Sequence, residues 1–542
     1  MPEQKLRFAL TPLAAGLMLA LSCAMAQAQE MSSDSDSNPN PDDAMPVRKV
    51  TINEFIVRGN TVLDARAIER AVTPHLGPDR TPQDVEAARN ALQAAYQERG
   101  YQSVYVDVPE QQVVGGVVFL QVNETRVGRV EITGARYNDP ETLRERVPAL
   151  QPGAVPDFNR AQQELTELNR TAKRQVIPLV RQSQVAGMMD VELKVEDESP
   201  WRFHASLNND RSLDTSSYRS VLTVGHDNLW QKGHVASLTF FTAPEKPSEA
   251  KVWSGSYALP LAGPDWMLEF SGYKSDSDVL SAGSTNVTGR GHSLGIKLSR
   301  TLPASGKWWH QLSAGIDFKN MDEQVSIAGM EAQYVPLKYA PITLAYNGFL
   351  QDERHQIGTG LQLVFGTRNF LGYGSDTKEF DWKRYKADPS FAAVRLDLSD
   401  TLTMQSGAQW FGRFSAQLTD DPLVSSEQLA AGGMYTVRGY LSAEALGDYG
   451  ALGTLEWRTR PMRLGPLQES RLYAFLDGAW LKLHAPLPET EREFSLASLG
   501  VGGNFRLFDH VHLRLDYGHT LNDGPSTRRG EGRLLFSLGA NF

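Results

Sequence analysis

Arg438 has the most distinctive chemistry in the sequence, because it is a cation set between glycines and apolar residues. It lies in the stretch GGMYTVRGY, residues 432–440, within a polar segment that runs from about residue 423 to residue 450. A guanidinium presents a planar fork of donors that matches a carboxylate. The glycines allow sharp turns and a close approach to another part of the chain. We therefore expect Arg438 to face an acidic partner.

Asp477 is the candidate partner, because its surroundings alternate as a β-strand does. Two sets of side chains alternate along RLYAFLDGAW, residues 471–480: Tyr473, Phe475 and Asp477 in one set, and Leu472, Leu476 and Trp480 in the other. If the second set faces lipid, Asp477 points to the opposite, polar side of the strand. A carboxylate there requires a partner, and Arg438 supplies matching donors.

Catalytic chemistry finds little support in the sequence. HExxH and GxSxG motifs are absent, and the stretch GSTNVTGRG, residues 283–291, lacks the Lys-Ser/Thr ending of a phosphate-binding loop. His510 and His512 fit polar positions of a strand better than they fit a metal site. We expect no enzyme activity, no cofactor and no metal. The net charge of −10 argues against nucleic-acid binding.

The N-terminus is organised like a secretory signal peptide. Lys5 and Arg7 precede an apolar run over residues 8–21, which is too short to span a membrane, and the series AMAQA follows. We expect residues 1–28 to be removed after export, together with Cys23, the one cysteine of the chain. A lipoprotein signal at Cys23 is the weaker alternative. Residues 29–47 are rich in Ser, Asp, Asn and Pro and predict a disordered leader.

Two compact α+β units follow, at residues 48–125 and 126–198, and both have the order β-α-α-β-β. Their leading elements are predicted as a strand over 47–59 and helices over 63–76 and 81–99 in the first unit, and helices over 139–150 and 157–173 in the second. The repetition indicates tandem domains of one kind. Most of their apolar residues are core. The functional interpretation is an exposed strand edge that pairs with an extended peptide.

The pattern of polar and apolar residues changes over residues 199–542. There, segments of about 10 to 15 residues alternate polar and apolar positions and are separated by turns. In HVHLRLDYGH, residues 510–519, every second residue from Val511 to Tyr517 is apolar. A soluble β-sandwich also alternates, but no second apolar layer is available here to cover the first. Sixteen such segments occur, an even number, and the last ends on Phe542. This pattern predicts a transmembrane β-barrel of sixteen antiparallel strands.

The connections between these segments alternate between short and long. The short ones include QKG and SGK, and the two longest span residues 368–389 and 421–449. With the two N-terminal units in the periplasm, the long links face the outside. Tryptophans beside the short links predict an aromatic girdle at the inner membrane face: Trp201, Trp230, Trp266, Trp308 and Trp309.

These features together resemble a known group of transporters. The VRGY motif at residues 437–440, with its flanking glycines, is similar to a signature of barrels related to the assembly factor BamA. The two N-terminal units resemble POTRA (polypeptide-transport-associated) domains. Two such domains before sixteen strands narrow the resemblance to the two-partner secretion transporters, the TpsB family (FhaC/ShlB/HecB-like). The resemblance covers the chain from about residue 48 to the end.

The resemblance implies a site in the barrel. In this superfamily the loop corresponding to residues 421–449 folds into the lumen, and its Arg pairs with the Asp of a second signature, F-x-D-x-G. Phe475 and Asp477 match that signature, whereas Ala479 stands in the usual glycine place. Arg438 and Asp477 are thereby implied to lock the loop to the barrel. The supporting motif residues are Gly433, Val437, Gly439, Tyr440 and Phe475. A solvated Arg438 in a wet pore is the alternative.

The resemblance also implies a function. We expect translocation of one large secreted protein across the Gram-negative outer membrane. POTRA domains in the periplasm would bind the partner's N-terminal secretion domain, and its chain would pass unfolded through the barrel. The partner would be an adhesin, a cytolysin or a contact-dependent toxin. Outer-membrane lipids and the barrel assembly machinery, with Phe542 as the assembly signal, complete the expected partners.

Two other functions remain open from the sequence. An outer-membrane assembly or insertion factor of the BamA/TamA type shares the loop signature, but such factors usually carry three or more POTRA domains. A passive porin is disfavoured by the POTRA-like units. Some relatives also begin with a helix that plugs the pore, which needs ~20 residues to cross a ~30 Å core. Residues 29–47 lack an amphipathic pattern, so we expect no N-terminal plug.

Overall fold

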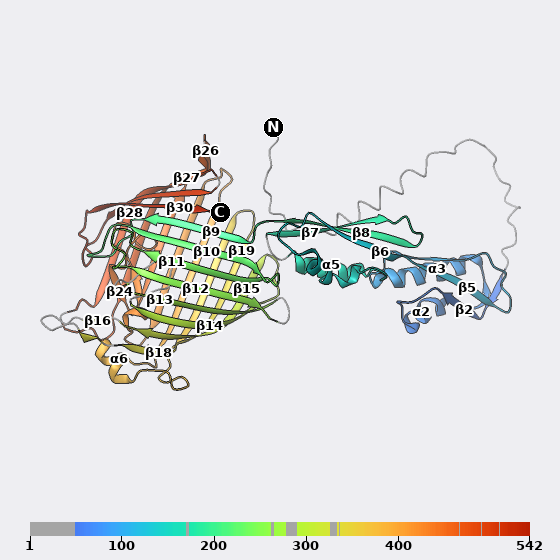
Figure 1. Cartoon of the computed structure of the whole chain (residues 1–542), viewed down its shortest axis with the longest axis horizontal. Coiled ribbons are helices and arrows are strands. Elements are labelled where there is room, and N and C mark those ends of the chain that lie inside the picture. Colours follow the sequence, from blue (N-terminus) through green and yellow to red (C-terminus); the bar gives the residue numbers. More distant parts are fainter. Residues whose placement is uncertain are drawn as a thin grey trace. The chain divides into compact units, whose positions relative to one another are not determined.

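The computed structural model describes residues 49–542 apart from 170–172, 262–264, 278–289, 323, 326–332, 335, 466, 489 and 509. The predicted signal peptide, the predicted leader and the expected lack of a plug concern residues outside this description. By its internal contacts the chain divides into two compact units, Met1–Thr125 and Arg126–Phe542. Figure 1 labels the elements of both units.

The first unit contains a three-stranded sheet in the order β2-β5-β4, with β2 parallel to β5 and β4 antiparallel to it. Its elements are β2 (Glu54–Arg58), α2 (Ala65–Val72), α3 (Pro82–Glu98), β4 (Val104–Asp107) and β5 (Val117–Glu124). The single strand predicted over 47–59 is wrong. It is divided at Asn53, and β1 (Val50–Ile52) pairs separately with β3 (Gly77–Arg80). The sequence of β3, GPDR, has no alternation, so it gave no strand signal.

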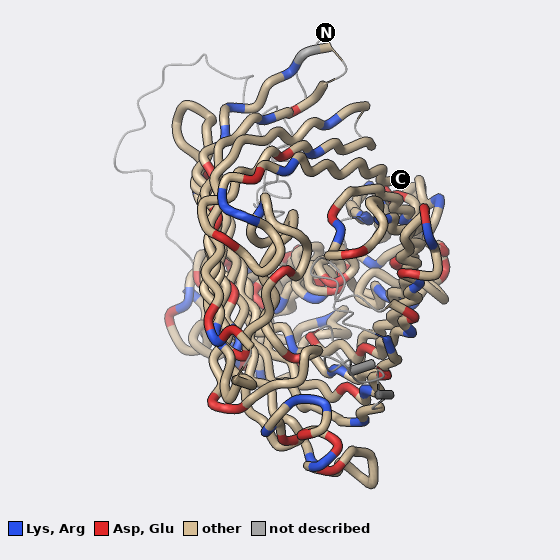
Figure 2. The backbone as a smooth tube through the Cα atoms, turned by 90° about the vertical axis from the view of Figure 1, so that its left-hand side faces the viewer, with Lys and Arg blue, Asp and Glu red and all other residues tan. Residues whose placement is uncertain are grey.

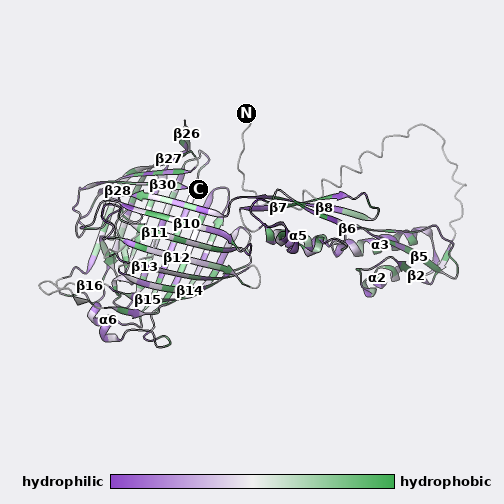
Figure 3. Cartoon of the chain, in the orientation of Figure 1, coloured by the Kyte–Doolittle hydropathy of each residue, from purple (hydrophilic) through white to green (hydrophobic). Residues whose placement is uncertain are grey.

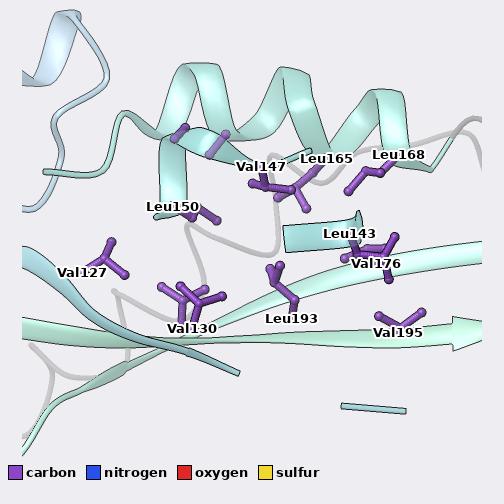
Figure 4. Packing of buried hydrophobic residues seen from close by; sticks show 13 residues of the cluster. Val127, Val130, Leu143, Val147, Leu150, Leu165, Leu168, Val176, Leu193 and Val195 are labelled. Carbon is purple, nitrogen blue, oxygen red and sulfur yellow. The ribbon is translucent and has the colours of Figure 1, made fainter. Parts of the chain in front are cut away.

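Residues 126–197 repeat this order of elements at the start of the second unit. They form β6 (Arg126–Thr133), α4 (Pro140–Glu145), α5 (Phe158–Leu168), β7 (Arg174–Gln182) and β8 (Met188–Asp197). The sheet order is β6-β8-β7, and α5 covers one face of it through Leu165 and Leu168 (Figure 4). The helix predicted over 139–150 is shorter than expected, because Pro148 cannot continue it and begins a 3-10 turn instead. Within the described ranges, no helix is long and apolar enough to cross a membrane.

The remainder of the second unit is a closed antiparallel barrel, which confirms the predicted sixteen strands. The long strands are β9 (Trp201–Asn208), β10 (Arg219–Leu229), β11 (His234–Thr242), β12 (Lys251–Pro260), β13 (Trp266–Ser275), β14 (Gly291–Thr301), β15 (Trp308–Met321), β19 (Ile342–Gln351), β20 (His355–Phe365), β21 (Ala392–Thr403), β22 (Gln409–Thr419), β25 (Tyr449–Arg458), β27 (Leu467–Lys482), β28 (Glu493–Leu507), β29 (Val511–Thr520) and β30 (Gly532–Asn541). Short strands β18 (Leu337–Tyr339) and β26 (Met462–Leu464) extend two of the ladders.

Strand alternation gives the barrel an apolar exterior and a polar interior. Hydrophobic and hydrophilic positions alternate along the strands in Figure 3. On β27, Leu472, Leu476 and Trp480 are exposed, whereas Tyr473 and Asp477 of the same strand are buried inside. The exposed side chains meet lipid, and the interior satisfies polar groups that lipid cannot.

Two predicted segments of the barrel differ in detail. The strand predicted over residues 333–348 is interrupted between β18 and β19, because Pro341 has no backbone N–H to donate to the ladder. The long link at 368–389 contains a helix, α6 (Thr377–Lys383), whose Phe380 packs against Tyr339. At the closure of the barrel, the backbones of Phe542 and Phe203 exchange two hydrogen bonds of 2.9 Å.

The core of residues 126–197 yields a first prediction. Leu193 is 1% exposed in this core, so Leu193→Ala should cost about 2–5 kcal/mol of its stability. Leu179→Ala on β7 is the matched control, because Leu179 is 38% exposed and should cost at most about 0.5 kcal/mol. Proteolysis of the full-length protein in increasing urea measures both. Equal resistance of the two variants would contradict the assigned core.

Candidate functional site

The link between β22 and β25 lies inside the barrel. It forms a short hairpin, β23 (Leu429–Ala431) paired with β24 (Ala445–Gly447), and a tip between them. The tip is buried: Met434, Val437 and Tyr440 are each at most 1% exposed. Among the described residues, Arg438 is the largest by volume of the fully buried side chains. The tip packs on the inner faces of β25, β27 and β29.

Arg438 and Asp477 form a bidentate pair. The Arg438 Nε donates to Asp477 Oδ2 at 2.7 Å, and Nη2 donates to Oδ1 at 2.7 Å. The backbone N–H of Arg438 also donates to Asp477 Oδ2, at 3.1 Å. The side chains are 2% and 0% exposed. This fork-on-carboxylate geometry fixes orientation as well as charge.

Two further carboxylates surround the same guanidinium. Arg438 Nη1 donates to Glu456 Oε1 at 2.7 Å and lies 3.4 Å from Asp516 Oδ1. Arg458 donates to Glu456 at 2.8 Å, and Arg514 donates to Asp516 at 2.6 Å. The cluster thus holds three guanidinium groups and three carboxylates, so its formal charge is zero. Neutrality makes burial of Arg438 and the three carboxylates tolerable, while Arg458 and Arg514 stay partly exposed.

Aromatic rings complete the pocket around Arg438. The ring of Phe475 lies under the guanidinium, 3.4 Å from Cζ to the centroid, in a cation–π arrangement. The Tyr473 hydroxyl donates to Asp516 at 2.8 Å. Burial by itself lowers the pKa of a guanidinium, but hydrogen bonding and charge from Asp477 outweigh it and raise the pKa of Arg438. Arg438 is therefore permanently charged and permanently dependent on its partners.

Glycines let the loop backbone touch the barrel wall. Gly433 and Gly439 have φ values of +100° and +101°, which other residues rarely adopt. On the wall, a Cβ added at Gly518 would lie 2.7 Å from the Gly439 nitrogen. Tyr440 fixes the contact, because its hydroxyl lies 3.0 and 2.7 Å from the carbonyl oxygens of Ala497 and Asn522, which share its one proton.

The structure gathers most of the sequence-predicted site residues at one place. Arg438, Asp477 and Phe475 are in contact, and Val437 and Tyr440 pack beside them on Ala479, which occupies the usual glycine position. Phe542 lies elsewhere, at the barrel closure.

Sequence reasoning missed Glu456, Asp516 and Gly518. Glu456 stands between the exposed Leu455 and Trp457, so strand alternation carried a signal for it. Gly518 carried none, because close approach of two backbones depends on the tertiary fold.

Polar and charged side chains line the lumen. Seen along the barrel from the α6 side, acidic and basic residues are interspersed (Figure 2). In the part of the chain that the structure describes, no group of three or more His, Cys, Asp or Glu side chains could hold a metal ion.

The closed sixteen-stranded barrel with an inward-folded loop, preceded in the sequence by domains of the β-α-α-β-β type, is the architecture of an outer-membrane β-barrel protein. The chain belongs to the haemolysin secretion/activation protein ShlB/FhaC/HecB family, whose model matches residues 187–505. The model of the ShlB-type POTRA domain matches residues 50–125. The protein is therefore a two-partner secretion transporter of the outer membrane with its POTRA region in the periplasm. These findings confirm the predicted family, function class and location.

Curated relatives agree with this family, and solved structures share the fold. The outer membrane transporter CdiB of Escherichia coli is 24% identical over 450 residues, covering 80% of this chain and 72% of the relative. CdiB of Dickeya dadantii (strain 3937) is 22% identical over 483 residues, covering 85% and 81%. The solved CdiB from Escherichia coli has a TM-score of 0.57 at 19% identity, covering 98% of this chain and 97% of that one.

The solved BamA barrel from Haemophilus ducreyi lacking POTRA domains 1–3 is also similar. It has a TM-score of 0.54 at 14% identity, covering 91% of this chain and all of that one. This likeness concerns the fold alone. The assembly-factor alternative is the weaker one, because the family model that matches the chain is that of the secretion transporters.

The contact between Gly439 and Gly518 generates a second prediction. Gly518→Ala places a Cβ 2.7–2.9 Å from loop backbone atoms, so it should push the tip off the wall and raise single-channel conductance by about twofold or more. Gly412→Ala on β22 is the control, because nothing lies within 4 Å of its Cβ position. Planar-bilayer recordings of both variants provide the measurement. Unchanged conductance in Gly518→Ala would contradict the close approach.

Proposed function

We propose that the periplasmic domains of this transporter capture one large secreted protein in extended form, and that its chain then passes unfolded through the barrel. The observation that carries this proposal is the loop held inside the lumen by a buried, charge-neutral cluster around Arg438. A loop so placed lines whatever path crosses the barrel. Arg438 and Asp477 act as its lock.

Strand addition is the mode of capture that the POTRA edges support. An extended peptide pairs with backbone groups that a sheet edge leaves unused. The edge of β4 is occupied, because Val106 donates its N–H to Gln93 at 3.2 Å. The first half of the β7 edge is also occupied, because Asn169 bonds both backbone groups of Val176 at 2.6 and 2.9 Å. Of these two edges the second half of β7 is the more open, and Val180 is exposed there, so we assign the partner to it.

The partner is a large exoprotein with an N-terminal secretion domain: an adhesin, a cytolysin or a contact-dependent toxin. The sequence contains no nucleotide-binding motif, so the energy of transport comes from the cargo, through its folding outside the cell. Outer-membrane lipids surround the apolar wall. The barrel assembly machinery recognises the C-terminal strand ending at Phe542.

The lock generates a third prediction. Removing either member leaves buried charges without a partner, at a cost of roughly 3–5 kcal/mol. Arg438→Ala and Asp477→Ala should each assemble in the outer membrane but secrete at least about tenfold less partner. Arg438→Lys keeps the charge but loses the fork, so it should restore secretion only in part.

The double variant tests whether the two residues act as a unit. It should be less impaired than the sum of the single variants. The rescue should be incomplete, because Glu456 and Asp516 remain after Arg438 is removed. Secreted partner is quantified against barrel abundance for all four variants. Strictly additive losses, or normal secretion from Arg438→Ala, would contradict the lock and indicate that Arg438 is a solvated loop residue.

A further inference from the structure

A second buried ion cluster holds the inward loop, at a site that neither sequence signature includes. Glu427 lies in a 3-10 turn (Ser425–Glu427) just before the hairpin and is 1% exposed. Its carboxylate accepts from Lys319 Nζ at 2.6 Å, from Arg395 Nη2 at 2.9 Å and from the Tyr339 hydroxyl at 2.8 Å. These three donors come from β15, β21 and β18.

The backbone of Glu427 is held as well. Its carbonyl oxygen accepts from Arg395 Nη2 at 3.1 Å and from Gln417 Nε2 on β22 at 3.0 Å. Burial by itself raises the pKa of a carboxyl, but the charges of Lys319 and Arg395 outweigh it and hold the pKa of Glu427 at about 2. Glu427 is therefore ionised at any physiological pH, and its attachment to the wall is not titrated away.

The loop's other end is fastened to the same region. The carboxylate of Asp448, which is fully buried, accepts from the backbone N–H groups of Leu423 and His484 at 3.0 and 2.7 Å. It also accepts from Gln428 at 2.8 Å. Both ends of the loop are thus bonded to each other and to the wall before the hairpin begins.

The two clusters use different arcs of the barrel wall. Glu427 is held by β15, β18, β21 and β22, whereas Arg438 is held by β25, β27 and β29. The tip then reaches the link after β9, where Asp210 accepts from the Met434 N–H at 3.1 Å and Arg211 accepts from the Ser442 N–H at 2.9 Å. The loop therefore contacts a continuous arc of the barrel wall, which runs from β15 through β22 and β25 to β29 and the link after β9.

Two cavities border the tip of the loop. One, of about 640 Å³, is lined by Tyr435 of the tip together with Asp210 and Arg514. The other, of about 830 Å³, is lined by Thr436 of the tip together with Ser256 and Lys319. Adjacent residues of the tip thus line different cavities, which share Thr239 in their linings.

We propose that the inward loop is a fixed partition, held to β15, β18, β21 and β22 by Glu427 and to β25, β27 and β29 by Arg438, and that the secreted chain passes beside it without displacing it. Glu427 is then a positioning residue. Withdrawal of the loop would separate buried ion pairs in both clusters at once, whereas passage alongside it breaks neither cluster. This inference rests on the proposed function, because it concerns the path that the secreted chain takes.

A reversible tether tests the partition directly. Asp210→Cys and Tyr435→Cys place thiols on two residues that line the same cavity, in a chain whose one native cysteine is Cys23. A short, reducible bis-thiosulfonate reagent joins them in intact cells that express the partner. We expect the tethered transporter to secrete within twofold of the same protein after reduction. Secretion that stops on tethering and returns on reduction would overturn the partition.

Controls separate this result from failure of the proposed function. The two single-cysteine variants receive the same reagent and should be unaffected. If the wild-type chain, without any tether, secretes no partner at all, the proposed function fails. Secretion that is normal in the wild-type chain but stops on tethering contradicts the partition alone.

A second measurement covers the case in which the double-cysteine variant does not assemble. Glu427→Ala should raise single-channel conductance at least twofold in planar bilayers, because the base of the loop loses its wall contacts. Asp397→Ala is the matched control on the lumen wall, since Asp397 contacts Arg413 and Ser415 of the wall. Glu427→Asp keeps the carboxylate, so its conductance should stay close to the wild-type value. Wild-type conductance in Glu427→Ala would overturn the assignment of Glu427.

Discussion

The buried guanidinium of Arg438 is the constraint on which the rest of the structure depends. An ionised group that is 2% exposed is tolerated only where carboxylates meet it at hydrogen-bonding distance, and here Asp477, Glu456 and Asp516 do so. Those carboxylates belong to β25, β27 and β29, so three strands must hold a common register. A shift of one residue in any of them would turn its carboxylate toward lipid.

The same alternation that builds the barrel therefore builds the site. On β27 the residues on either side of Asp477 face outward, where Leu476 is 52% exposed. The closed ladder satisfies the backbone, and the lumen is left free for polar and charged side chains. The loop then supplies the cation Arg438 to carboxylates of the wall and the carboxylate of Glu427 to cations of the wall. Function resides in the inner face of the strands, whereas stability in the membrane resides in the outer face.

Much of this arrangement was predictable from the sequence, because it follows from local patterns of polar and apolar residues. Strict alternation located all sixteen strands, and Asp477 was found because its neighbours alternate. Elements without a local pattern were missed. The strand β3 has the sequence GPDR, and the hairpin of β23 and β24 lies in a segment without a strand pattern.

The sequence analysis also missed site residues whose partners are distant in sequence. Glu427 has no pattern in its own segment, and its significance comes from Lys319 and Arg395, which are 108 and 32 residues away. Glu456 and Asp516 stand at polar positions of their strands, but which loop residue they face depends on how strands distant in sequence are brought together. Pairings of this kind are set by closure of the barrel, so a single sequence does not reveal them.

The most direct measurement of the central claim is the distance between the loop and the strand that carries Asp477. Spin labels at Tyr435 and at the lipid-facing Leu476, read by pulsed electron resonance in proteoliposomes, report that distance. The account predicts one narrow distribution in the otherwise wild-type protein and a broad one after Arg438→Ala. A distribution that is already broad, or one that Arg438→Ala leaves unchanged, would contradict the claim that this buried guanidinium holds the loop in the lumen.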